Sequence, residues 1–204
     1  DRLMSRGLGD VYKRQVYGLN DKKKKIKEEN ENIINNNNHL KKYKKKWFLQ
    51  KTNLERKFSE LSKYKIKIVI LRMFSFLGPS ILGLDYAPSK FHKSIKNKKK
   101  IFINGPLNTY RSYLDEKDMV EWIIKIFLNF NKKLEIYNFG SENCIKIYDL
   151  AIKMYNRKNL KKIVLINKSS KIDYYVPSVK KLKDTFKIKE KMTLKKSINL
   201  LFNR

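Results

Sequence analysis

A short apolar run followed by alternating helix-like and strand-like segments sets the tightest limit on this fold. Ile66 to Leu71 reads IKIVIL, which has the length of a strand and the composition of a buried parallel one. Before it, Lys46 to Lys63 places apolar residues in steps of three and four, as on an amphipathic helix. The polar residues 22–38 predict an exposed loop. Residues 119–130 predict a helix that Asp118 could cap, with an apolar face of Val120, Ile123, Ile124 and Phe127. We expect further strands at 101–103, 134–137 and 163–166, and further helices at 147–155, 179–185 and 194–202. This alternation predicts an α/β layer fold with a mostly parallel sheet.

The composition narrows the class of protein. The 204 residues include 49 Lys and Arg against 19 Asp and Glu, a formal net charge of +30. The lysines are spread along the whole chain, and abundant Lys, Asn and Ile beside only seven Gly are typical of an AT-rich coding sequence. We therefore explain the high positive charge by compositional bias together with a site for an anionic small molecule, in preference to a nucleic-acid partner.

Two further features concern the cellular compartment. The only cysteine, Cys144, excludes an internal disulfide framework and suits a reducing compartment. No run of the sequence reaches the roughly 18 apolar residues of a membrane span, because the best candidate, Ile68 to Leu84, is interrupted by polar residues and Pro79. We expect a cytoplasmic protein that does not enter a membrane.

The order of motifs along the chain resembles that of a known family. The motifs are Val16-Tyr17-Gly18, a helix with Lys51 and Glu55, then ILRMFSFLGP, INGPLNTYRSYLDEKD and IYNFGS. This order is similar to that of the extended short-chain dehydrogenase/reductases, and more narrowly to the NAD-dependent nucleotide-sugar epimerases and dehydratases. The resemblance implies an incomplete Rossmann-type parallel sheet, its C-terminal part, with a small α/β substrate-binding lobe.

The resemblance also implies a domain organisation. Residues 1–15 (DRLMSRGLGDVYKRQ) resemble translated sequencing adapter, so we expect them to lie outside the fold. Residues 16–80 would form the C-terminal part of the Rossmann domain. Residues 81–204 would form the substrate-binding lobe, interleaved with the final Rossmann elements.

The cofactor and partners follow from the same resemblance. The intact protein would use NAD(P) and a nucleotide diphosphate sugar, and it could form a homodimer. However, the sequence has no Gly-x-x-Gly-x-x-Gly loop after a strand, the feature that places a helix N-terminus against the pyrophosphate. We therefore expect that the N-terminal half of the Rossmann domain is missing and that this fragment does not bind NAD.

The resemblance assigns the catalytic lysine to Lys51, which would hold the cofactor ribose. In the family a tyrosine four residues earlier removes a proton from the sugar, but here that position is Trp47, whose indole cannot act as a general base. The segment from Tyr86 to Lys90 (YAPSK) matches the same Tyr-x-x-x-Lys pattern. Pro88 disfavours a helix interior there, so Tyr86 is a weak substitute.

The resemblance also assigns binding residues. Phe74 would line the cofactor, and Ser75, where the family usually has Asn, would face the sugar nucleotide. Arg111 would clamp the diphosphate, a role for which a planar guanidinium is well shaped. His39 and His92 lie apart without companion ligands, so no metal site is expected.

The sequence thus predicts a fragment of an NAD-dependent nucleotide-sugar epimerase or dehydratase that serves surface-polysaccharide synthesis. Two alternatives stay open. Trp47 allows a catalytically inactive sugar-nucleotide-binding or scaffold protein, and the high charge allows a basic RNA-binding protein.

Overall fold

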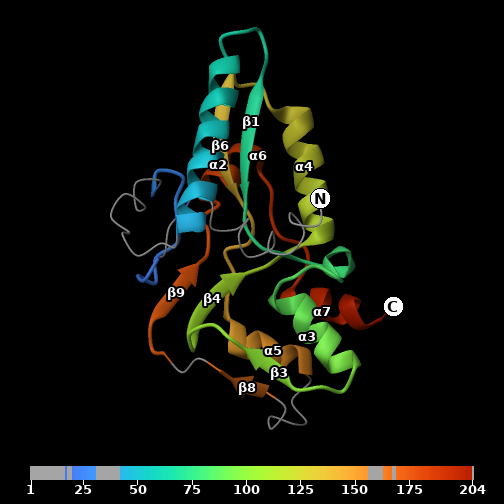
Figure 1. Ribbon diagram of the computed structural model, residues 1–204. Coiled ribbons are helices and arrows are strands. Elements are labelled where there is room, and N and C mark those ends of the chain that lie inside the picture. The colour runs from blue at the N-terminus through green and yellow to red at the C-terminus, as the bar shows by residue number, and fades with distance from the viewer. Residues whose placement is uncertain (1–16, 18–19, 31–41, 156–162, 167–168, 204) are drawn as a thin grey trace.

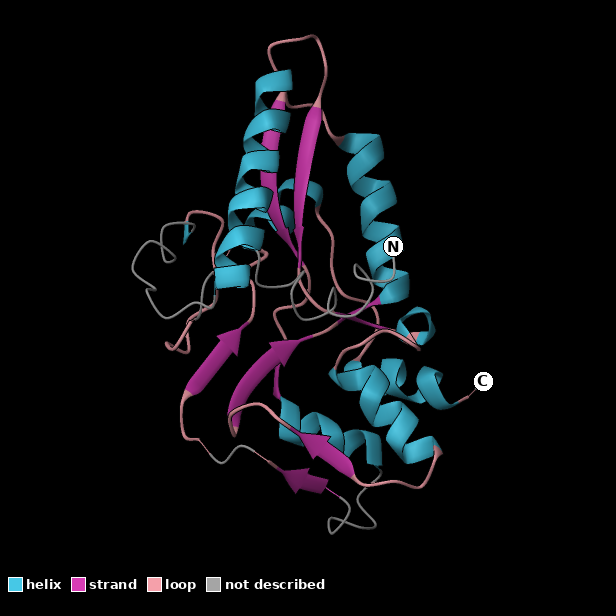
Figure 2. Cartoon of the chain, in the orientation of Figure 1, coloured by secondary structure: helices cyan, strands magenta, loops and turns pink. Residues whose placement is uncertain are grey.

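The computed structural model describes residues 17, 20–30, 42–155, 163–166 and 169–203 (Figures 1 and 2). The helices are α2 (Lys42–Leu61), α3 (Ala87–Lys96), α4 (Glu116–Asn129), α5 (Ile147–Tyr155), α6 (Lys180–Phe186) and α7 (Leu194–Phe202), with a 3₁₀ turn at Pro79–Ile81. The strands are β1 (Ile68–Met73), β2 (Phe76–Leu77), β3 (Ile101–Ile103), β4 (Asn108–Ser112), β5 (Leu114–Asp115), β6 (Leu134–Phe139), β7 (Cys144–Lys146), β8 (Ile163–Leu165) and β9 (Ile172–Tyr175). Residues 1–15, expected to lie outside the fold, are not among the described residues.

The strands form small sheets that are mostly parallel. β1 pairs with β6, β2 with β5 and β3 with β8, each in parallel. In the fourth sheet, β4 lies between antiparallel β7 and parallel β9. The predicted α/β class with a mostly parallel sheet is confirmed. The strands β2, β4, β5, β7 and β9 were not expected.

The β1–β6 pair forms the upper part of the molecule, with α2 and α4 on either side of it (Figure 1). The predicted apolar run is β1, and its register places Arg72 beside Asn138. Just beyond, the Phe74 amide donates to the Phe139 carbonyl oxygen at 2.8 Å. A Cβ on Gly140 would stand 2.9 Å from the Phe74 Cβ, so this turn needs glycine to let the two strand ends meet.

One hydrophobic core lies under β1 and β6, and another lies at the opposite end of the molecule. Here β3 and β8 pack with α3, α5 and α7 (Figure 1), and the fully buried side chains include Ile101 and Leu150. α7 begins at a capped end, because the Thr193 side chain accepts from the Lys196 amide. Ser197 on α7 then donates to the buried Asp115 carboxylate at 2.5 Å. That bond ties the C-terminal helix to the start of α4.

α4 turns a different face to the core from the one that its sequence suggests. The apolar stripe Val120, Ile123, Ile124 and Phe127 is exposed, with Phe127 81% accessible, whereas Trp122 is buried. The Trp122 ring packs edge-on against Phe139 in the core under β1 and β6. The reason is that this short sheet covers only one side of the helix.

The cap of α4 also differs from the expected one. The sequence suggested Asp118 as the capping residue, but the Asp115 side chain accepts from the Lys117 amide. Asp118 is buried within the first turn, and its carboxylate accepts from the Lys191 and Met192 amides at 3.0 Å. It therefore anchors the segment before α7 instead of starting α4.

The segment at residues 20–30 packs against the rest of the protein more than its polar sequence suggests. We expected an exposed loop over residues 22–38, of which 31–38 lie outside the described residues. Ile26 is buried, bridges Pro177 and exchanges backbone hydrogen bonds with Val176 and Ser178. The segment therefore lies along the end of β9.

Candidate functional site

A cavity of about 550 Å³ lies between α2 and β1, within the size range of ligand sites. The expected residues Lys51 and Phe74 both line it, one from α2 and one from the end of β1. Lys51 is partly buried, as its place on the apolar stripe of α2 suggested. The structure thus brings together two of the predicted site residues. They are joined by Tyr17, from the first motif of the family resemblance, and by Tyr175, which the sequence did not single out.

The polar end of this cavity is organised around Arg72. Its Nε and Nη2 donate to the two Glu55 carboxylate oxygens at 3.0 and 2.7 Å. Its Nη1 donates to the Tyr17 hydroxyl at 2.9 Å and to the Glu28 carbonyl oxygen at 3.0 Å. The Arg72 side chain is 3% exposed, so this is a buried and multiply bonded guanidinium.

The Tyr17 hydroxyl extends the network toward β6. It donates to Asn138 Oδ1 at 2.5 Å, and Asn138 Nδ2 donates to the Ile26 carbonyl oxygen at 2.9 Å. Burial raises the pKa of Tyr17 above its ordinary range, although the Arg72 guanidinium opposes this effect. Tyr17 therefore stays protonated near neutral pH and serves as a hydrogen-bond donor.

Aromatic rings form the floor where the cavity meets β9. The Phe74 ring stacks on Tyr175 with centroids 4.6 Å apart, and Tyr17 lies 5.8 Å from Phe74 on the other side. A guanidinium closes each end of this row: Arg72 lies 5.2 Å from the Tyr17 ring and Arg111 5.9 Å from the Tyr175 ring. The row links β1 to the β4–β9 sheet.

Arg111 itself does not line the cavity. It projects from β4 toward β9, where its Nη2 donates to Asp173 Oδ2 at 2.9 Å. Nη1 also donates to the backbone carbonyl oxygens of Tyr110 and Asp173, at 2.6 and 3.2 Å. The guanidinium predicted to clamp a diphosphate is thus held by a buried carboxylate.

The remaining predicted residues lie in different surroundings. Ser75 is buried, and its carbonyl oxygen accepts from the Leu114 amide where β2 meets β5. Trp47 belongs to α2, one turn before Lys51, but its side chain lies outside the described ones. No described contact therefore bears on its part in the site.

Tyr86 is separated from Lys51 by the fold. It caps α3, which begins with Pro88 in its first turn, and its hydroxyl donates to the Phe76 carbonyl oxygen at 2.6 Å in the lower core. Burial raises the pKa of Tyr86 well above its ordinary range, which argues against a role as a base. Lys90, its sequence partner, forms a surface ion pair with Asp85 at 2.6 Å.

Only some of the residues in these hydrogen-bond networks could have been predicted from the sequence. Glu55 and Arg72 were noted as motif positions, and a carboxylate on a helix facing an arginine at a strand end could have indicated a pair. Glu28, Asp173 and Tyr175 carried no local signal. They join the site only because distant segments meet there.

Two further observations bound the chemistry. Within the described ranges, no group of three or more His, Cys, Asp or Glu side chains is placed to hold a metal ion. His92 lies against the Phe202 ring at 4.9 Å, and His39 is outside the described residues. Every helix that the structure describes is too short or too polar to cross a lipid bilayer.

Comparison with solved structures identifies similar folds. One is dTDP-glucose 4,6-dehydratase from Bacillus anthracis, in complex with NAD, which matches with a TM-score of 0.71 and 17% identity. This match covers 92% of this chain and 57% of the other. UDP-glucuronic acid 4-epimerase from Bacillus cereus, in complex with UDP-glucuronic acid and NAD, matches with a TM-score of 0.67 and 17% identity, over 93% and 58%. UDP-glucose 4-epimerase from Thermotoga maritima, with UDP-glucose, matches with a TM-score of 0.65 and 16% identity. This match covers 76% of this chain and 51% of the other.

The chain spans little more than half the length of these solved structures. At such identities the likeness concerns the fold, and it confirms a partial Rossmann-like architecture. No curated protein sequence matches the chain.

A family model supplies the assignment that these structures alone do not. The model of the NAD dependent epimerase/dehydratase family matches residues 15–140, which is more than half of the chain. The matched range contains Tyr17, Lys51, Arg72 and Arg111, and it confirms the resemblance seen in the motif order. This chain therefore belongs to the NAD dependent epimerase/dehydratase family.

Proposed function

We propose that this chain is the C-terminal part of an NAD-dependent enzyme that epimerises or dehydrates a nucleotide sugar, in surface-polysaccharide synthesis. The observation that carries the proposal is that Lys51 and Phe74 line one cavity in a chain of this family. Lys51 would donate to ribose hydroxyls, and Phe74 would cover the adjoining ring. When bound, NAD would supply the hydride acceptor for the sugar carbon.

The fragment status is supported by surfaces that the described fold leaves uncovered. Among the described residues, β1 pairs on one edge only, with β6, although strands of parallel sheets are usually flanked and covered. α4, which packs against the same sheet through Trp122, leaves an apolar stripe exposed on another face. Both features are those expected if further strands and a helix continue this sheet in the intact protein.

The cavity fits the ribose end of a dinucleotide better than its pyrophosphate. Lys51 offers an ammonium donor and Phe74 a ring, but the sequence lacks the glycine-rich loop that would present backbone amides to phosphate. We therefore expect this chain to bind a nucleotide diphosphate sugar, with Arg111 and Ser75 on the substrate side, and not to bind NAD.

Calorimetric titration of this chain tests the proposal, with UDP-glucose, dTDP-glucose and NAD as separate ligands. Arg111→Lys should weaken nucleotide-sugar binding several-fold, because it keeps the charge but loses the planar fork. Arg56→Lys is the matched control, since Arg56 is exposed on α2 and does not line the cavity. Equal affinity in wild type and Arg111→Lys, or no binding of any nucleotide sugar, would contradict the assignment of the substrate side. Micromolar binding of NAD would contradict the missing pyrophosphate site.

The catalytically inactive alternative rests on Trp47. A protein that binds the sugar nucleotide but lacks a base would act as a binding or scaffold protein. Restoring a tyrosine at position 47 separates this alternative from an active enzyme.

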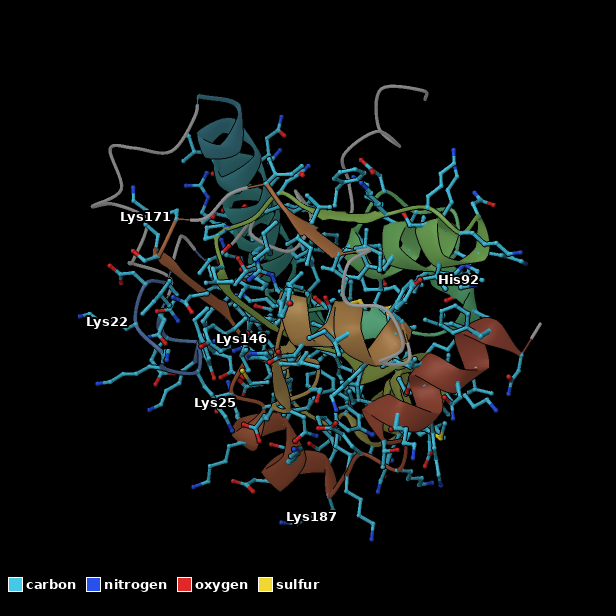
Figure 3. All side chains as sticks on the ribbon, turned by 90° about the horizontal axis from the view of Figure 1, so that it is seen from below. Lys22, Lys25, His92, Lys146, Lys171 and Lys187 are labelled. Atoms are coloured by element: carbon cyan, nitrogen blue, oxygen red, sulfur yellow. The ribbon has the colours of Figure 1, made fainter. Side chains whose placement is uncertain are left out.

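A second candidate function, single-stranded RNA binding, is favoured by one surface. Lys23 and Lys146 place their ammonium groups 5.3 and 5.6 Å from the Tyr110 ring centroid, on the β7-β4-β9 sheet. Figure 3 shows Lys22, Lys25, Lys146 and Lys171 along the same side of the molecule. Basic groups around a partly exposed ring suit stacked bases and phosphates.

Anisotropy of a labelled single-stranded RNA distinguishes this second function. RNA binding at this surface predicts an affinity that falls steeply with salt and is lost in the double variant Lys23→Glu/Lys146→Glu. A double variant at Lys99 and Lys100, exposed lysines elsewhere, is the control. Equal losses in both double variants would show charge attraction without a defined site.

A further inference from the structure

Two connecting segments lie together at the end of the molecule where β1 and β6 begin. Residues 62–67 join α2 to β1, and residues 130–133 join α4 to β6. The two strands run parallel with Ile68 opposite Leu134, and the Ile68 amide donates to the Lys133 carbonyl oxygen at 2.9 Å. Figure 1 shows the connection between α2 and β1 at the very top of the molecule. Residues 61–67 and 128–133 are called the upper tip below.

Large apolar side chains are exposed at the upper tip. Tyr64 is 65% exposed and Leu128 is 73% exposed. Leu61 and Ile66, which also line the cavity, are 41% and 53% exposed. The turn that carries Tyr64 is closed by a backbone hydrogen bond, in which the Tyr64 amide donates to the Leu61 carbonyl oxygen at 3.0 Å. Such a group of exposed apolar side chains is typical of a surface that contacts a partner.

The same tip is strongly basic. Its two connecting segments read SKYKIK and FNKK, with several lysines and no Asp or Glu. Lys132 forms an ion pair with Glu135 at 2.8 Å. The exposed lysines beside it are Lys63, Lys65, Lys67 and Lys133. Lysines interleaved with a tyrosine and aliphatic side chains complement an anionic lipid surface, because the ammonium groups meet the headgroup charges while the apolar groups reach the boundary with the acyl chains.

The charge and the position of the upper tip distinguish this partner from others. A second copy of the chain would bring two basic tips together on molecules of formal charge +30, and like charges repel. Small ligands of parallel α/β sheets bind beyond the carboxyl ends of the strands, where Arg72 and Phe74 lie on β1. The upper tip lies at the other end of that strand, so a surface bound there leaves the proposed site accessible.

We propose that the upper tip binds the surface of an anionic lipid bilayer. Tyr64 and Leu128 lie at the headgroup boundary, and the exposed lysines face the lipid phosphates. The contact is peripheral, with the chain lying on the bilayer surface. This inference goes beyond the proposed function and does not depend on it.

Flotation with lipid vesicles tests the charged part of the contact. Wild type should bind vesicles of equal parts phosphatidylglycerol and phosphatidylcholine, and should not bind vesicles of phosphatidylcholine alone. One lysine near an anionic surface changes affinity by about fivefold, so Lys63→Gln/Lys65→Gln should weaken binding by at least about tenfold. Lys99→Gln/Lys100→Gln is the matched control, because it removes the same charge beside exposed Phe102 at the opposite end of the molecule.

The apolar part of the contact needs variants that leave the charge unchanged. Tyr64→Ser/Leu128→Ser should weaken binding to the anionic vesicles about tenfold, and Phe102→Ser should not. Both tip side chains are largely exposed, so their replacement should leave the fold intact. In a Cys144→Ser background, an environment-sensitive dye attached to Tyr64→Cys should shift its emission to shorter wavelength on anionic vesicles. The same dye on Phe102→Cys should not shift.

Three results would overturn the proposal. Equal losses in the two lysine double variants would show attraction of a basic chain without a defined contact. An unshifted dye at position 64 on vesicles that bind the protein would place the contact elsewhere. Loss of RNA binding in the tip variants, with vesicle binding unchanged, would assign the tip to nucleic acid. Because none of these measurements uses a nucleotide sugar, failure of the proposed function would show only in the titrations.

Discussion

Arg111 and Asp173 form a buried two-point ion pair between adjacent strands, with Nη2–Oδ2 at 2.9 Å and Nη1–Oδ1 at 3.3 Å. The side chains are 10% and 11% exposed, so neither charge is well hydrated. The pair therefore joins β4 to β9 beneath the aromatic row. A diphosphate that binds Arg111 would have to share it with Asp173.

Breaking this pair should destabilise the protein strongly. Arg111→Met removes the ion pair from the buried Asp173 carboxylate, and we expect a loss of about 3 kcal/mol in the free energy of unfolding. The double variant Arg111→Met/Asp173→Leu should lose less than the sum of the single changes, because no charge is left stranded. Urea unfolding of the four proteins measures this. Additive losses would show that the two side chains act independently.

The two faces of α4 should respond differently to substitution. Trp122→Ala should cost about 3–5 kcal/mol, because it empties a core position and removes the bond from the indole to the Lys189 carbonyl oxygen. Phe127→Ser on the exposed face should change stability by no more than about 0.5 kcal/mol. Thermal unfolding of both variants tests the orientation of the helix. A large loss from Phe127→Ser would mean that this face is buried in solution.

Glu135 should contribute a pH-dependent part of the stability. It accepts from Lys132 at 2.8 Å and Lys181 at 2.5 Å, and these bonds lower its pKa to about 2. Because the pKa in the folded state lies below its value of 4.5 in the absence of such contacts, the stabilisation is present above pH 4.5 and is lost as the pH falls toward 2.

The comparison of wild type with Glu135→Gln checks this effect. Since both lysines are substantially exposed, the difference near neutral pH should be at most about 1 kcal/mol. It should shrink between pH 4.5 and 2 in urea unfolding experiments. Glu121→Gln, which removes an exposed pair with Lys191, is the control. A Glu135→Gln difference that grows on acidification would contradict the sign.

If the protein has lost its base at position 47, Trp47→Tyr should raise turnover in a version of the protein with the rest of the nucleotide-binding domain restored. The change places a titratable hydroxyl one helical turn from Lys51, and general-base effects are typically about 10²–10⁴-fold. On that alternative, wild type should bind a nucleotide diphosphate sugar but turn it over very slowly. Tyr86→Phe should have no effect on turnover, because that hydroxyl is bonded to the Phe76 carbonyl oxygen in a separate core. Fast wild-type turnover would show that the base lies elsewhere.

The sequence by itself determined the layer class and most of the elements. The apolar run of β1 and the periodic patterns of α5 and α7 are local signals, and the structure has α5 and α7 at the bounds expected for them. Lys51 and Phe74 were also placed by local motif, and the structure sets both in one cavity. These features depend on neighbours within a few residues, which a single sequence displays.

Only the tertiary structure decided which faces are buried and which charges are paired. α4 is apolar on more than one side, so its sequence could not show that Trp122 and not Phe127 meets the sheet. Likewise, the pairing of Arg111 with Asp173 joins residues 62 positions apart. Such pairs form when β4 and β9 lie side by side, because the free energy of a buried charge depends on its surroundings and not on its position along the chain.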